Sequence, residues 1–193
     1  MIETPRIMLI RHAEKPREGE CGVAIDGSPS PQSLSVVGWQ RAGALVRLFV
    51  PAAPVPPRSP ILRPAHVFAA RPTDTHPSLR PRETVTPLAQ ALGLQVDESW
   101  SDDDDPARVA AALRELQGPV LVCWRHRSLP DLADELLQRA EVPRHWPEQR
   151  FDLVWIVAGE GPRWTFSQLP QQLLPGDRTQ SVPRRVPAAG VRR

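Results

Sequence analysis

Residues 6–12 read RIMLIRH, a run of apolar side chains that ends in an arginine and a histidine. A continuous apolar run of this length is typical of a strand that is buried on both faces of a sheet. Residues 120–126 read VLVCWRH and repeat the pattern. Ligands of open α/β sheets bind beyond the carboxyl ends of the strands. We therefore expect His12 and His126 to lie close together in one pocket.

Strand-like and helix-like segments alternate along the rest of the chain. A third strand is expected over residues 66–70, and a Gly-Glu-Gly-Pro turn joins residues 151–157 and 164–169 into an antiparallel hairpin. This alternation predicts a layered α/β domain with a mostly parallel sheet and the hairpin near one edge.

The expected helices are marked by capping residues and prolines. They run from a cap at Ser33 or Ser35 to Pro51, over residues 84–92, from a cap at Asp105 to Leu116, and from a capping box at Ser128 and Asp131 to about residue 140. Pro87 is compatible with the second of these helices only if it lies in the first turn.

The composition fits a single folded domain. The chain has 193 residues, of which 40% are hydrophobic, and its 24 prolines exclude coiled coils and long uninterrupted helices. Residues 182–193 hold four arginines and no acidic residue, so the rest of the chain carries a net charge of −2. We predict one catalytic domain over residues 1–181 and a disordered tail over residues 182–193.

Several classes of protein are disfavoured. Outside the tail the arginines are scattered, which argues against a nucleic-acid-binding face. Cys21 and Cys123 are too few and too far apart for a disulfide scaffold or a cysteine-rich metal site. No apolar run approaches the ~18 residues of a membrane span, and the chain opens without a basic-then-apolar leader. We expect a soluble, cytoplasmic protein without a membrane partner.

The residues at the strand ends suit phosphate chemistry. Arg11 and Arg125 each precede a histidine, and Arg80 lies just before the helix that follows the strand at 66–70. Arginine presents a planar fork of donors that matches phosphate oxygens, and nearby positive charge lowers the pKa of an imidazole. A neutral imidazole is a nucleophile. The alternative is that each histidine is a structural residue at a strand end.

Four ordered motifs resemble those of the histidine phosphatase superfamily. They are RHAEKP at residues 11–16, LSVVGWQRA at 34–42, SLRPRET at 78–84 and VLVCWRH at 120–126. The segment RHAEKP is similar to that of a small phosphatase-like subgroup, and the resemblance covers residues 6–170.

The resemblance implies a phosphoglycerate mutase-like fold, which is a three-layer α/β/α sandwich with a mostly parallel central sheet. It also implies a metal-independent phosphatase that uses no cofactor and acts on a small phosphorylated molecule or a phosphoprotein. His12 would form a phosphohistidine, while Arg11, Arg80 and His126 would hold the phosphoryl oxygens. Such donors stabilise the charge that develops in the transition state.

The general acid for the leaving group is not identified by the motifs. The candidates are Glu14, Glu98 and Asp103, with Asp74 and Asp102 as further alternatives, and His76 lies in a loop from which it could approach the substrate. For the acidic run at residues 102–105 we favour a solvated helix cap over a catalytic acid or a metal site.

Two other functions compete with the phosphatase. One is a phosphate-binding module that has lost turnover, suggested by the missing acid and by Arg125, where the subgroup often has an acidic residue. Retention of both histidines argues against it. The other is a metal-dependent hydrolase, for which two histidines without a spaced pair of carboxylates make a poor site. Arg125 and Arg127 either make the pocket strongly basic or turn one side chain outward.

Overall fold

A six-stranded sheet forms the middle of the protein. The computed structural model describes residues 5–53, 59–160 and 163–185. The strands of the sheet are β1 (Arg6–Arg11), β4 (His66–Ala69), β5 (Val96–Asp97), β6 (Val120–Trp124), β7 (Leu153–Glu160) and β8 (Arg163–Pro170). Their order is β5-β4-β6-β1-β7-β8. The first four strands are parallel, and β7 is antiparallel to both β1 and the edge strand β8. A separate two-stranded sheet pairs β2 (Gly22–Val23) with β3 (Pro29–Ser30).

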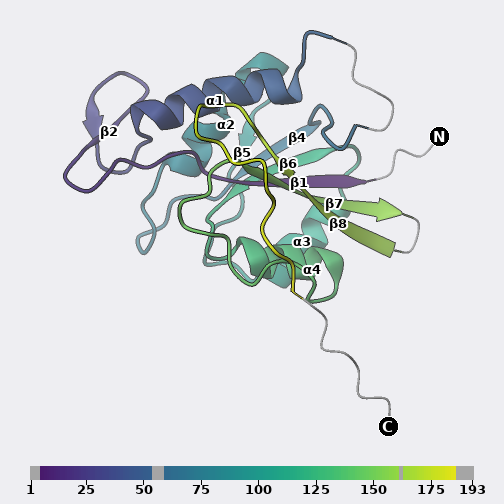
Figure 1. Ribbon diagram of the computed structural model, residues 1–193. Coiled ribbons are helices and arrows are strands. Elements are labelled where there is room, and N and C mark those ends of the chain that lie inside the picture. The colour runs from purple at the N-terminus through teal and green to yellow at the C-terminus, as the bar shows by residue number, and fades with distance from the viewer. Residues whose placement is uncertain (1–4, 54–58, 161–162, 186–193) are drawn as a thin grey trace.

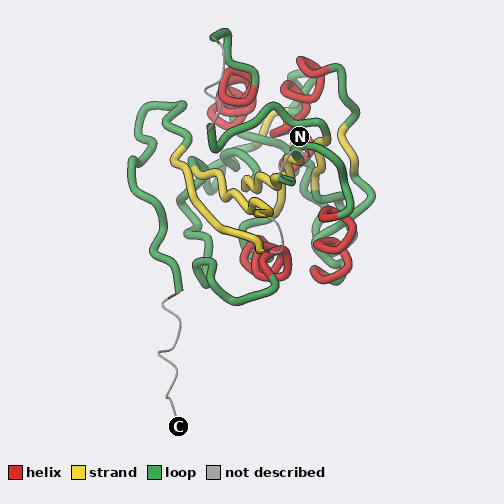
Figure 2. The backbone as a smooth tube through the Cα atoms, turned by 90° about the vertical axis from the view of Figure 1, so that its right-hand side faces the viewer, coloured by secondary structure: helices red, strands yellow, loops and turns green. Residues whose placement is uncertain are grey.

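Helices cover both faces of the sheet. They are α1 (Val36–Phe49), α2 (Arg80–Leu92), α3 (Pro106–Arg114) and α4 (Leu129–Leu137). Helices α1 and α2 pack together on one face, and α3 and α4 pack together on the other (Figures 1 and 2). The predicted fold class, a three-layer α/β/α sandwich with a mostly parallel sheet, is confirmed.

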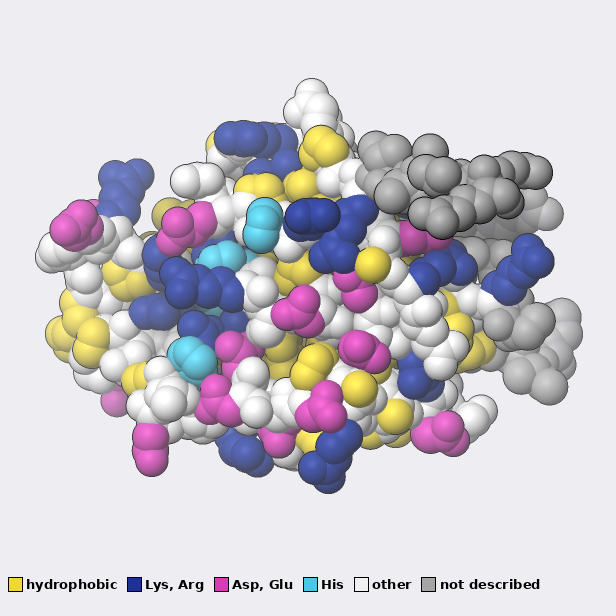
Figure 3. All heavy atoms as spheres, turned by 90° about the horizontal axis from the view of Figure 1, so that it is seen from below, with side chains coloured by type: hydrophobic (Ala, Val, Ile, Leu, Met, Phe, Trp, Pro, Cys, Tyr) yellow, Lys and Arg dark blue, Asp and Glu magenta, His cyan; other side chains and the backbone are white. Residues whose placement is uncertain are grey.

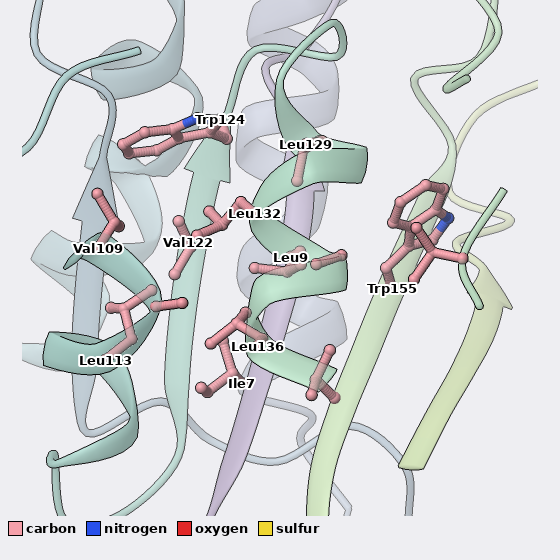
Figure 4. Close-up of a cluster of buried hydrophobic side chains, with 14 of the residues drawn as sticks. Ile7, Leu9, Val109, Leu113, Val122, Trp124, Leu129, Leu132, Leu136 and Trp155 are labelled. Atoms are coloured by element: carbon pink, nitrogen blue, oxygen red, sulfur yellow. The ribbon is translucent and has the colours of Figure 1, made fainter. Parts of the chain in front are cut away.

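The central strands are apolar throughout because each of their faces has a helical layer to pack on. Alternate side chains point to opposite faces of a strand. Ile7 and Leu9 of β1 belong to the core under α3 and α4, whereas Met8 and Ile10 belong to the core under α1 and α2. Figure 4 shows the first of these cores, in which Ile7 and Leu9 lie beneath the leucines of α4.

The register of the two central strands places their histidines at the same edge of the sheet. Strand β1 pairs with β6 in parallel, with Arg11 opposite Trp124. The backbone N–H of His12 donates to the carbonyl of Trp124 at 3.2 Å, so the pairing continues one residue past the strand. The motifs at residues 6–12 and 120–126 therefore end side by side, as their repetition predicts.

Helix α2 differs from its prediction. It begins at Arg80, before residue 84, and Pro87 lies inside it rather than in its first turn. The prediction that Pro87 must lie in the first turn is therefore wrong. Pro81, at the start of the helix, sets a favourable backbone angle there.

The helix caps follow the sequence at two places and depart from it at a third. Ser35 accepts from the backbone N–H of Gly38, and Asp105 accepts from that of Ala107, as predicted. The capping box at Ser128 is wrong, because the Ser128 side chain makes no cap bond and its hydroxyl donates to Asp102 instead.

The C-terminal segment after β8 (residues 171–185) is bonded to the body of the protein. Asp177 accepts two hydrogen bonds from the guanidinium of Arg41, at 2.7 and 3.1 Å. Further along, the N–H of Val182 donates to Gln168, and Arg185 pairs with Asp134 at 3.0 Å. Val182 and Arg185, which belong to the segment predicted as a disordered tail (182–193), are thus bonded to the body of the protein. Residues 186–193 lie outside the described residues.

Cys21 is exposed and Cys123 is buried, and both are free thiols. In the part of the chain that the structure describes, none of the helices combines the length and the apolar character needed to span a bilayer.

Candidate active site

A cavity of about 320 Å³ opens at the carboxyl ends of β1 and β6. It brings together His12, Arg80 and His126, three of the residues predicted for the site. Figure 3 shows histidine side chains surrounded by lysine and arginine side chains at one end of the face that it views. The residues that line the cavity are His12, Lys15, Gln32, Thr75, His76, Pro77, Ser78, Arg80, Arg125, His126, Arg127 and Glu148.

His12 is held as a neutral imidazole with one defined free nitrogen. Its side chain is almost buried, and its Nδ1 lies 2.7 Å from the carbonyl oxygen of Ala13. A carbonyl can only accept, so Nδ1 carries the proton and Nε2 keeps its lone pair. Burial lowers the pKa of His12 to about 3, and the charge of Arg11 adds to this effect. The ring is therefore unprotonated at neutral pH, as a nucleophile must be.

His126 lies at the corresponding end of β6 and is also neutral. Burial lowers its pKa to about 4, with further contributions from the charges of Arg11 and Arg127. Both arginines that flank His126 line the cavity. Arg125 is paired with Asp102 at 3.0 Å, whereas Arg127 is exposed. Neither of the two turns away from the cavity.

Arg80, the first residue of α2, is fixed by three hydrogen bonds. Its Nε donates to the carbonyl of Ser33 at 3.0 Å, and its Nη2 donates to the carbonyl of Pro31 at 2.6 Å. Its Nη1 donates to the hydroxyl of Ser78 at 3.3 Å. Burial lowers the pKa of Arg80, an effect that the charge of Glu83 opposes. The guanidinium thus has a defined orientation before any ligand binds.

Arg11 occupies a different place from the one predicted. It does not belong to the residues that line the cavity. Its Nη1 donates to the backbone carbonyl of Glu148 and, at 3.4 Å, to that of Arg150, and its guanidinium lies 3.9 Å from the centre of the Phe151 ring. Burial lowers the pKa of Arg11 only to about 10, so it stays charged. It anchors the segment at 147–151 and lowers the pKa of both histidines.

Thr84 joins the loop after β1 to α2. Its Oγ1 accepts from the backbone N–H of Ala13 at 2.8 Å and donates to the carbonyl of Arg80 at 2.7 Å. Because Ala13 in turn binds the His12 ring, one buried hydroxyl links the backbone next to His12 to the backbone of Arg80. The nearby Glu83 is also buried and accepts from the hydroxyl of Ser33 and the N–H of Leu34.

None of the three carboxylates predicted as general acids lines the cavity. Both oxygens of Glu14 accept from Arg41, at distances from 2.7 to 3.1 Å. Glu98 lies 3.5 Å from Arg82 and lines a different cavity. Asp103 is the nearest of the three, since it binds Thr75 and His76, which do line the cavity.

Glu148 is a cavity residue that the sequence did not indicate. It lies in the irregular segment before β7, pairs with Lys15 at 3.2 Å, and has its pKa lowered by that contact. Neither a motif nor a periodic pattern surrounds it, so nothing in the sequence pointed to the site.

The rest of the described structure offers no comparable site. A cavity of about 740 Å³ lies between α3 and α4, but its lining contains neither histidine nor cysteine. Among the residues that the structure describes, no group of three or more His, Cys, Asp or Glu side chains is arranged to hold a metal ion.

No protein-family model and no curated protein sequence matches the chain. Solved structures do match it. The protein histidine phosphatase SixA, complexed with tungstate, is 17% identical with a TM-score of 0.55, and the match covers 86% of this chain and 97% of SixA. A putative alpha-ribazole-5'-P phosphatase from Escherichia coli is 15% identical with a TM-score of 0.54, covering 86% of this chain and 96% of that one.

A mycobacterial glucosyl-3-phosphoglycerate phosphatase gives a third match. It is 15% identical with a TM-score of 0.52, and the match covers 85% of this chain and 97% of that chain. At such identities the shared property is the arrangement of helices and strands, which extends over almost the whole of each of these proteins. The chain therefore shares the phosphoglycerate mutase-like fold of these three phosphatases.

Proposed function

We propose that the protein is a metal-independent phosphatase that hydrolyses a phosphomonoester through a phosphohistidine on His12. One observation carries this proposal. His12 is neutral, its Nδ1–H is bound to Ala13, and its free Nε2 belongs to a ring that lines the same cavity as Arg80 and His126. A positioned nucleophile beside fixed phosphate donors is the arrangement that phosphoryl transfer requires.

In the proposed reaction, Nε2 of His12 attacks phosphorus and the bond from phosphorus to the ester oxygen breaks. Arg80 and His126 bind the equatorial oxygens, on which negative charge accumulates in the transition state. Water then attacks the phosphohistidine, which releases inorganic phosphate and restores neutral His12. Burial is the main cause that keeps both histidines neutral, and the charge of Arg11 adds to it from outside the cavity.

The charge of the cavity supports a phosphorylated ligand. Arg80, Arg125, Arg127 and Lys15 line it together with the histidines, and Glu148 is the carboxylate in the lining. Arginines in such positions supply the positive charge that a metal ion supplies in other phosphatases. The proposed substrate is a small phosphorylated molecule or a phosphorylated protein side chain.

Trapping of the intermediate tests this function. We expect the wild-type protein to hydrolyse a generic aryl phosphate in the presence of a chelator and to carry acid-labile, base-stable phosphate on His12 when the reaction is quenched. His12→Ala should abolish both. His66→Ala is the matched control, because His66 lies at the opposite end of β4 and binds the carbonyl of Gln117. A wild-type protein that binds phosphate esters without turnover would show a binding module instead.

A further inference from the structure

His76 lies in the loop between β4 and α2, and its side chain lines the cavity beside His12 and His126. At this point two reciprocal backbone hydrogen bonds close a tight turn in the loop. The N–H of His76 donates to the carbonyl of Thr73, and the N–H of Thr73 donates to the carbonyl of His76, both at 3.0 Å. The Thr73 hydroxyl also accepts from the N–H of His76 at 3.1 Å. The backbone that carries this imidazole is therefore fixed.

The His76 ring is oriented by a carboxylate. Its Nδ1 lies 3.1 Å from Oδ1 of Asp103, whose Oδ2 accepts from the hydroxyls of Thr73 at 2.8 Å and Thr75 at 2.7 Å. The hydrogen bonds from the two threonines lower the pKa of Asp103, so it is an anion that can only accept. Nδ1 is thus the donor to Asp103. In the imidazolium form of the ring, Nε2 carries the second proton, and this proton is left for a ligand.

The other titratable groups of the cavity are poorly suited to giving up a proton. The low pKa values of His12 and His126 leave both rings neutral at pH 7. Glu148 is ionised beside Lys15, and the ammonium of Lys15 is bound to it at 3.2 Å. Asp102, whose Oδ2 lies 3.9 Å from Nδ1 of His76, is paired with Arg125. His76 is the remaining side chain of the lining that can act as a general acid.

We infer that His76 is the general acid of the proposed phosphatase and that Asp103 is the residue that positions it. This inference rests on the proposed function. As Nε2 of His12 bonds to phosphorus, the electron pair of the breaking P–O bond goes to the ester oxygen, which takes the proton from Nε2 of His76. His76 is then neutral. It recovers a proton from the water molecule whose oxygen attacks the phosphohistidine. The products of the full reaction are the alcohol and inorganic phosphate.

This role makes a distinctive prediction about leaving groups. An alkyl phosphate must be protonated as it leaves, because an alkoxide is a poor leaving group. p-Nitrophenyl phosphate releases a stabilised phenolate and needs little help from an acid. Loss of a general acid therefore affects the first substrate far more than the second, whereas loss of structure affects both alike.

The experiment compares kcat/KM of His76→Gln with the wild type on glycerol 3-phosphate, p-nitrophenyl phosphate and aryl phosphates with phenols of graded pKa. General acids contribute about 10²- to 10⁴-fold, so we expect a loss of about a hundredfold or more on the alkyl ester. On p-nitrophenyl phosphate the loss should be small, and the dependence on the pKa of the phenol should steepen. Asp103→Asn should also steepen the dependence of kcat/KM on the pKa of the phenol, but less than His76→Gln does. His66→Gln should leave this dependence unchanged.

Three results would overturn the inference. Equal losses of His76→Gln on all the esters would make His76 a structural residue, and unchanged rates on all of them would remove it from the reaction. If either of these results is found while the wild type still traps phosphate on His12, the role of His76 is refuted but the proposed function is not. A wild type that hydrolyses none of the esters and traps no phosphate refutes the proposed function, and the role of His76 with it.

Discussion

The cavity has two parts that are built differently. Its floor (His12, Arg80 and His126) is set by strand ends and a helix start and is buried or half-buried. Its rim (Lys15, Arg127 and Glu148) lies on loops, and the side chains of Lys15 and Glu148 are about half exposed, at 48% and 56%. Charges on the floor act at low dielectric, whereas those on the rim are screened by water. We therefore expect the floor to determine the rate of phosphoryl transfer and the rim to determine which ester is accepted.

Arg80→Ala should show the largest effect in this comparison. Removing one preorganised donor to the transition state costs about 3 kcal/mol, or on the order of a hundredfold in kcat. Inhibition by inorganic phosphate should weaken as well. Steady-state kinetics with an aryl phosphate measures both effects. The control is Arg82→Ala, because Arg82 also lies on α2 and its exposed side chain pairs with Glu98. Equal effects of the two variants would show that Arg80 does not bind the phosphoryl group.

The buried floor should also make the protein sensitive to acid. The pKa of His12 is 6.5 in the unfolded chain and about 3 in the folded one, so the unfolded chain takes up the proton first as the pH falls. This contribution to stability is complete above pH 6.5 and is lost between pH 6.5 and 3. Each protonation of this kind adds about 1.4 kcal/mol per pH unit to the slope of stability against pH.

Urea unfolding of the wild type and His12→Gln at several pH values measures this slope. The variant should lose stability less steeply over this range, with His126 accounting for part of the slope that remains. Parallel curves for the two proteins would mean that His12 is not buried in its neutral form.

Thr84→Val tests whether the floor depends on its support. The substitution keeps the shape of the side chain but leaves the N–H of Ala13 without its acceptor. An unsatisfied buried donor costs about 1–3 kcal/mol, which thermal unfolding can measure, and kcat should fall because Ala13 holds the His12 ring. Thr86→Val removes the equivalent bond to its own helix, to the carbonyl of Arg82, without a contact to the loop after β1. Loss of activity in both variants would argue against a specific role for Thr84.

Arg127→Gln should give the smallest effect, confined to substrate preference. Exposed charges contribute about 0.2–1 kcal/mol, so KM should rise only a few-fold, most for esters that carry a second negative charge and least at high salt. Arg47→Gln serves as the control, because the side chain of Arg47 is exposed and lies in the last turn of α1. A large fall in kcat would instead show that Arg127 contributes to the rate of phosphoryl transfer.

The same division describes what could be predicted from the sequence. The apolar runs that form β1 and β6 fix both histidines at one edge of the sheet. Arg80 was expected just before a helix over residues 84–92, whereas it is the first residue of α2. Side-chain direction was not predictable in the same way. Ser128 turns to Asp102 instead of capping its helix, and Glu14 turns to Arg41, because partners distant in sequence compete for these groups.

Glu148 was not predicted at all, and Thr84 was noted only as the last residue of the motif at 78–84. Thr84 matters through a bond to Ala13, and Glu148 through its approach to Lys15, and both contacts arise only when the chain has folded. For Arg11 the sequence predicted the residue but not the position of its side chain. Its motif identified the residue, but the carbonyls of residues 147–150 determine where its guanidinium lies.

The C-terminal segment has a consequence for the order in which the protein is made. Arg41 is buried between Glu14, two residues after His12, and Asp177, near the other end of the chain. During synthesis the N-terminal half emerges first, so Arg41 and Glu14 are available long before Asp177 exists. A buried guanidinium short of one of its two carboxylates is unfavourable. We therefore expect the loop that follows β1 to gain the full support of Arg41 only after Asp177 has joined the fold.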